Sequence, residues 1–131
     1  MASYTEHYGL HQWAPEDDFL RTDFNTDFQK IDTAIAEKPE FVFGTYTGDG
    51  TARRHIELGF RPKSVMVVGS SGVSSESGNE GGFVLDGYPI LIGFYTHMEI
   101  EDGGFAVYYH YDLGNSTINK EGTIHYYQAM R

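Results

Sequence analysis

The hydrophobic pattern of the chain changes near residue 39. Before it, apolar side chains recur every three or four positions, which places them on one stripe of a helix. The stripe comprises Leu20, Phe24, Phe28, Ile31 and Ile35. The spacing predicts an amphipathic helix over 23–37, with Thr22 as its N-cap. Pro39 ends this segment, because the residue before a proline leaves the helical region.

After Pro39, apolar and polar residues alternate over short runs that Gly-rich turns separate, a pattern typical of β-strands. In a predicted hairpin over 97–110, Met98, Ile100, Phe105, Val107 and Tyr109 face inward. The other predicted strands cover 41–48, 53–60, 63–69, two runs within 82–95, and 123–130, and loops cover 70–82 and 112–122. In the last strand Ile124, Tyr126 and Gln128 share one face. About eight short strands predict an antiparallel, jelly-roll-like β-sandwich, so the fold class is mainly β.

The chain therefore divides into an N-terminal segment, 1–38, and a β-sandwich domain, 39–131. The first part of the N-terminal segment has no helical or strand period, yet it carries Tyr4, Tyr8, Leu10 and Trp13. It is interpreted as an extended arm that packs on a surface of its own chain or of a partner, with Trp13 as the anchor. A satellite cluster under a loop is the alternative.

The apolar stripe of the helix needs a partner, because an isolated helix of this length is marginal in water. It packs either on its own β-domain or on copies of itself around a symmetry axis. Two heptads are too few for an independent coiled coil, so self-association would need help from the β-domain. The candidate oligomer or attachment interface consists of Trp13, Leu20, Phe24, Phe28, Ile31 and Ile35.

Composition and charge exclude several classes of function. The 131 residues suit one compact domain, and the absence of cysteine excludes disulfides and thiolate sites. The net charge of −10 argues against nucleic acid and anionic membranes as partners. The sequence contains no apolar run long enough to span a bilayer and no secretory signal. It begins with Met, so we expect a whole gene product made in a cytoplasm.

No catalytic or cofactor-binding motif is present, so we expect neither enzymatic activity nor a cofactor. Glu99, Glu101 and Asp102 are paired carboxylates, but alternation puts Glu99 and Glu101 on the outer face of a strand, where solvated edge charges explain them. His7 and His11 are four residues apart without a third ligand, so no metal site is predicted within one chain. A metal on a symmetry axis stays open.

Tyrosines are dense in the C-terminal half of the chain. Exposed tyrosine rings stack on sugars, although tyrosines are equally ordinary in the strands of a β-sandwich. The candidate glycan contacts are Tyr88, Tyr95, Tyr108, Tyr111 and Tyr127.

Three stretches resemble parts of known phage proteins. GTYTGDGTARRHIELGFRPKSVMVVGSSG (44–72) resembles a module of bacteriophage tail-fibre and receptor-binding proteins, with its Gly-x-Tyr-x-Gly-Asp-Gly turn and Leu-Gly-Phe-x-Pro run. The ending GTIHYYQAMR (122–131) is similar to the close of that module. YGLHQWAPEDDFLRTDFNTDFQKIDTAIAE (8–37) resembles the short adaptor near the N-termini of phage tail proteins.

The resemblance implies a structural virion protein, generally homotrimeric, that sits on a tail or baseplate, contacts other tail proteins and touches the host surface, where the exposed tyrosines would meet a host-surface glycan. It implies no catalysis. We therefore expect a fibre, fibre tip or baseplate or collar decoration that attaches by residues 1–38 and displays the sandwich. The alternatives are a carbohydrate-binding module without a virion role and an enzyme whose site lies between subunits.

Overall fold

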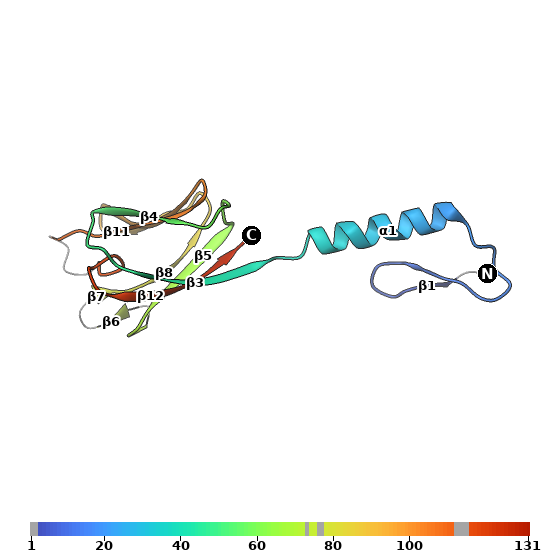
Figure 1. Ribbon diagram of the computed structural model, residues 1–131, viewed down its shortest axis with the longest axis horizontal. Coiled ribbons are helices and arrows are strands. Elements are labelled where there is room, and N and C mark those ends of the chain that lie inside the picture. The colour runs from blue at the N-terminus through green and yellow to red at the C-terminus, as the bar shows by residue number, and fades with distance from the viewer. Residues whose placement is uncertain (1–2, 73, 76–77, 112–115) are drawn as a thin grey trace. The chain divides into compact units, whose positions relative to one another are not determined.

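The computed structural model describes residues 3–72, 74–75, 78–111 and 116–131, and it divides the chain into two compact units (Figure 1). The units are Met1–Pro39 and Glu40–Arg131. Their boundary lies one residue from the division that Pro39 indicates in the sequence.

The N-terminal unit begins with a small hairpin in place of the expected extended arm. Strands β1 (Ser3–Tyr4) and β2 (His11–Gln12) pair antiparallel. The chain reverses through Gly9, whose φ of 61° is a conformation that favours glycine. The backbone N–H of Thr5 donates to the carbonyl of Leu10 at 2.8 Å and closes the turn. These strands are too short to leave an alternating pattern in the sequence.

The helix α1 (Arg21–Ala36) follows the hairpin. Its N-cap is Leu20, in extended conformation and without a side-chain cap, so the prediction of Thr22 as N-cap is wrong. Thr22 lies in the first turn instead, where its carbonyl accepts a hydrogen bond from the Thr26 hydroxyl at 2.8 Å. Within the described residues, no helix is long and apolar enough to cross a membrane.

The second unit is a sandwich of two antiparallel four-stranded sheets, which confirms the predicted mainly β fold. One sheet contains, in order, β3 (Phe41–Thr47), β12 (Ile124–Met130), β5 (Ser64–Gly69) and β8 (Gly82–Leu85). The other contains β4 (Arg53–Glu57), β11 (Gly104–Tyr108), β10 (Tyr95–Glu101) and β9 (Ile90–Ile92). The predicted loop over 70–82 holds a further short pair, β6 (Ser74–Ser75) and β7 (Gly78–Asn79).

The core lies between the two sheets and centres on Phe105, which is fully buried. Its ring packs edge-on against Tyr127 at 5.4 Å and Tyr46 at 6.3 Å. The predicted inward residues Met98, Ile100, Phe105 and Val107 are all buried, as alternation requires. Tyr109 is only partly buried, because it lies beyond the end of β11.

Two histidines, His97 and His125, are also buried in this unit. The ring nitrogens of His97 contact Ser116 Oγ and the Gly81 carbonyl, each at 3.1 Å. Those of His125 contact Thr123 Oγ1 at 2.8 Å and the Glu80 carbonyl at 2.9 Å. Burial lowers the pKa of both side chains, because it disfavours the charged imidazolium.

Candidate interaction surfaces

The hairpin is held on one face of α1 through Asp27, the helix residue that is most buried. The backbone N–H of His11 donates to Asp27 Oδ2 at 2.8 Å, and the ring Nδ1 of His11 contacts Oδ1 at 2.9 Å. Burial raises the pKa of Asp27, but the hydrogen bonds from His11 outweigh it, and the pKa lies below its ordinary value. Lys30 Nζ donates to the Gly9 carbonyl at 2.7 Å. Polar contacts thus fix the rotation of the helix under the hairpin.

An aromatic cluster closes the N-terminal end of this arrangement. The Trp13 ring stacks on Phe24 at 5.0 Å and contacts Phe19 at 4.5 Å, and Phe24 lies 6.0 Å from Phe28. Phe19 also belongs to this aromatic cluster, but the helical spacing could not identify it because it precedes the helix. The Trp13 indole Nε1 is buried and has no hydrogen-bond partner in the described part of the chain.

The apolar stripe of α1 lies beside the hairpin and is left exposed within its own unit. Phe28 is 63% exposed and Ile35 65%, with Leu20 and Ile31 also exposed. Trp13 and Phe24 are half-buried by their mutual stacking. A groove of about 190 Å³ runs between hairpin and stripe. It is lined by Leu10, His11, Trp13, Phe24, Asp27, Phe28 and Ile31. The structure therefore brings together four of the six predicted interface residues, and Leu20 and Ile35 lie outside the groove.

Asp27→Ala is expected to release the hairpin from α1, because the backbone N–H and ring of His11 would lose their acceptors. Trp13 is the only tryptophan, so its emission reports on the hairpin alone. We expect a red shift and faster proteolysis between residues 5 and 20. Asp32→Ala, at an exposed position of the same helix, is the matched control. Equal emission spectra for the two variants would show that the Asp27 contacts do not hold the hairpin.

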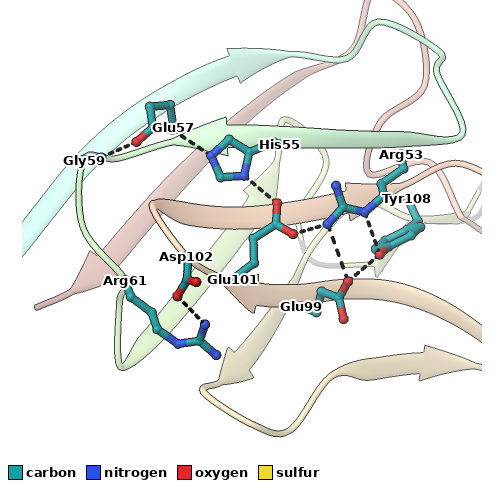
Figure 2. A network of polar contacts seen from close by, with 9 residues as sticks. All are labelled: Arg53, His55, Glu57, Gly59, Arg61, Glu99, Glu101, Asp102 and Tyr108. Carbon is teal, nitrogen blue, oxygen red and sulfur yellow. Dashed lines mark hydrogen bonds and ion pairs between the residues drawn. The ribbon is translucent and has the colours of Figure 1, made fainter.

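A polar network covers the outer face of the second sheet (Figure 2). Arg53 is its centre: it pairs with Glu101, donates to Tyr108 Oη at 3.0 Å and lies 3.8 Å from Glu99. The Tyr108 hydroxyl in turn donates to Glu99. Glu99 and Glu101 lie on the outer face, as alternation predicts. They are not edge charges, however, because β10 lies between β11 and β9 inside the sheet.

His55 extends this network toward the turn after β4. Its Nδ1 contacts Glu101 and its Nε2 contacts Glu57 at 2.9 Å, while Glu57 accepts from the Gly59 N–H at 2.8 Å. The hydrogen bond to Glu101 and the one to Glu57 raise the pKa of His55, since they favour the charged ring. Glu99 and Glu101 pair with Arg53, and Glu57 and Glu101 pair with His55. The arrangement joins side chains of β4, β11 and β10 across the outer face of this sheet.

Acidification is expected to destabilise the sandwich between about pH 7.5 and about pH 5.5. The folded-state pKa values of His97 and His125 lie below the unfolded value. The unfolded chain therefore binds protons first, and stability is lost as pH falls below about 6.5. His55 acts in the opposite sense, because its raised pKa gives stability below about pH 6.5 that is lost at higher pH, but it is partly exposed.

Urea unfolding followed by circular dichroism measures this loss, which linkage limits to about 1.4 kcal/mol per buried histidine for each pH unit. In His125→Gln the free energy of unfolding should fall less between about pH 7.5 and about pH 5.5 than in the wild type, even though the variant is less stable at both pH values. An unchanged wild-type unfolding free energy across this range would contradict the assignment of neutral buried rings.

The five candidate glycan tyrosines do not form one site. Tyr88 and Tyr111 are 73% and 86% exposed, and Tyr95 lies at the surface with its ring 4.7 Å from that of His110. Tyr108 belongs to the polar network. Tyr127 is on the inward face of β12 and packs against the core, so it cannot stack on an external sugar.

The turn within the 44–72 segment is held by Asp49. Its carboxylate accepts hydrogen bonds from the hydroxyl and backbone N–H of Thr51 and from the Asn119 amide. These bonds lower the pKa of Asp49 to about 2, with the Thr51 hydroxyl as the largest cause. The Asp in the Gly-Asp-Gly turn therefore has a structural role, since it ties the β3–β4 connection to the segment before β12.

Among the described residues, no group of three or more His, Asp or Glu side chains is arranged to hold a metal ion. His11 is engaged by Asp27, and His7 is exposed at the hairpin turn. No protein-family model, curated protein or solved structure matches the chain.

Proposed function

We propose that the protein is a non-enzymatic structural component of a phage or phage-like tail. In this proposal the N-terminal unit attaches the chain to its own copies and to other tail or baseplate proteins. The β-sandwich is displayed on the virion for recognition of a host surface. A homotrimer is the assembly that the resemblance of residues 44–72 to tail-fibre modules favours.

The observation that carries the proposal is the exposed stripe of α1. The hairpin is fixed to the Asp27 face of the helix and leaves Phe28 and Ile35 more than 60% exposed. An apolar stripe of this kind beside an aromatic groove marks an interaction surface. Its heptad spacing is the one with which helices pack around a common axis. The paired carboxylates, in contrast, are all engaged by Arg53, His55 or Arg61.

Two measurements test this function. Light scattering of the full chain at micromolar concentration should give a multiple of 14.8 kDa. Immunogold electron microscopy, with antibodies against the sandwich, should label tails of particles from the strain that carries the gene. A clean monomer together with unlabelled particles would overturn the proposal.

A carbohydrate-binding module is the second candidate, and the exposed rings around Tyr95 favour it. Phe94, the residue before Tyr95, is fully exposed. The His110 ring lies 4.7 Å from the Tyr95 ring, and the exposed Tyr111 is the next residue after His110. Exposed aromatic rings of this kind offer stacking platforms for sugars. An array of bacterial polysaccharides probed with wild type and Tyr95→Ala tests it. Binding that the substitution does not weaken would exclude this patch as the glycan site.

A further inference from the structure

The two sheets of the sandwich have outer faces of opposite character. None of the four strands β3, β12, β5 and β8 contains Asp, Glu, Lys or Arg. Seven outward positions of this sheet carry large apolar side chains that are 39% to 71% exposed. They are Phe41, Phe43, Met66, Phe83, Leu85, Ile124 and Tyr126. We call this set the apolar sheet face.

The register places several of these side chains in one continuous row. Phe43 lies opposite Gln128, Gln128 opposite Met66, and Met66 opposite Phe83. Phe43 is 71% exposed and Phe83 57%, so both ends of the row are open. The row therefore crosses all four strands, and Gln128 is its only polar member.

The other sheet shows what an outer face of this protein looks like when it is solvated. Its outer face carries Arg53, His55, Glu57, Glu99 and Glu101, and the polar network of Figure 2 covers it. Because the chain has a net charge of −10, two copies repel each other through most of their surfaces. On the apolar sheet face, a contact between identical copies would not bring like charges together, because its strands carry no charged side chain.

The size of the apolar sheet face suits a contact between subunits. Taking about 200 Å² for a large side chain, the exposed fractions amount to about 700 Å² per chain. Stable interfaces bury about 800 Å² per partner, and monomers rarely leave a contiguous apolar patch beyond about 600 Å² exposed. The helix stripe would add to this area in the same assembly.

We infer that the apolar sheet face is an interface between the sandwich domains of two copies of this chain. The inference depends on the proposed self-assembly and assigns it a second surface, separate from the helix stripe. It also implies that the polar network, on the outer face of the other sheet, points away from the neighbouring copy.

Cysteine cross-linking tests the inference directly. The chain has no cysteine, so a single introduced thiol forms disulfides only between copies. Met66→Cys lies in the middle of the apolar sheet face, and Leu91→Cys is an exposed control on β9 of the other sheet. Copper-phenanthroline oxidation of the full chain should give disulfide-linked dimers with Met66→Cys in several-fold higher yield than with the control.

A matched pair of charge substitutions gives the second arm. Leu85→Glu and Leu91→Glu place the same charge on exposed leucines of the edge strands β8 and β9. Light scattering should show a lower mass for Leu85→Glu alone, with circular dichroism confirming that both variants are folded.

The outcomes separate this inference from the proposed function. The sheet interface would be overturned if Met66→Cys cross-linked no better than Leu91→Cys and Leu85→Glu had the same mass as Leu91→Glu. If Phe28→Asp still dissociated the protein, assembly through α1 would remain supported. A disulfide within one chain of the double variant Met66→Cys/Phe28→Cys would show that the chain's own helix covers the face, which also overturns the inference. A monomeric wild type overturns both.

Discussion

Phe28→Asp is expected to reduce the mass of the assembled protein to that of the 14.8 kDa chain. Phe28 lies in the middle of the stripe and lines the groove beside Trp13. A carboxylate there would have to be buried among the apolar side chains of a second copy, without a partner charge. Such burial costs several kcal/mol, and about 4 kcal/mol already weakens association about a thousandfold. Light scattering over a range of micromolar concentrations measures the change.

Gln29→Asp is the matched control for this experiment. It adds the same charge one position along α1, at an exposed site off the stripe. The control should keep the wild-type mass, and both variants should keep their helix content, because Phe28 is 63% exposed within its own unit. If Phe28→Asp assembled like the control, the stripe would not be an interface.

Elements whose periodicity extends over several residues were predictable from the sequence. The spacing from Phe24 to Ile35 predicted α1, and alternation predicted the strands of the hairpin around 102–103 with Phe105 inward. Pro39 marked the change between the two units because it constrains its own backbone and that of its neighbour. In these cases the structure follows from a local property of the sequence, either the spacing of apolar residues or the backbone constraint of proline.

The N-terminal hairpin was not predictable in this way, because contacts distant in sequence hold it. Its two-residue strands have no period, and Asp27 lies 16 residues from His11, whose backbone and ring it binds. An aspartate beside an apolar stripe is usually a solvated residue. Only the folded structure shows that the Asp27 carboxylate contacts both the backbone N–H and the ring of His11.

The orientation of β12 shows why alternation alone leaves a choice. Both faces of this strand carry aromatic side chains, so the pattern does not tell which face is inward. The structure buries His125, packs Tyr127 against the core and exposes Ile124 and Tyr126. A Cβ at Gly44, opposite Tyr127 in the register, would lie 2.3 Å from the tyrosine hydroxyl. The glycine on the neighbouring strand is thus the residue that makes room for Tyr127.

The two outer sheet faces, on which the functional proposals depend, were also not predictable from the sequence pattern. The absence of charge from four separate strands becomes one surface only when the strand order is known, since β3, β5, β8 and β12 are spread over 90 residues of chain. Arg53, Tyr108 and Glu101 likewise become neighbours through the order β4-β11-β10. The sequence pattern indicates the strands of the two four-stranded sheets, but it does not tell which of these strands are neighbours in one sheet.

Gly104→Ala is expected to cause the largest loss of stability in the sandwich. A Cβ at this position would lie 2.0 Å from the Ile56 carbonyl oxygen and 3.1 Å from its carbon, both backbone atoms of β4. Backbone in a paired strand cannot move aside without breaking hydrogen bonds, and β11 is held between β4 and β10. We expect the free energy of unfolding to fall by at least about 3 kcal/mol, at the upper end of overpacking effects.

Gly82→Ala separates this clash from the general effect of adding a methyl group to a strand glycine. Its Cβ would meet only the flexible ends of Ile90 and Met98, at 2.8 and 3.3 Å, and these side chains can turn away. Urea unfolding followed by circular dichroism should therefore show a far lower midpoint for Gly104→Ala than for Gly82→Ala. Trp13 emission should stay unchanged in both, because the tryptophan reports on the other unit. Equal midpoints would mean that β4 and β11 can separate at little cost, and the polar network that spans them would then be too loose to define a fixed outer face.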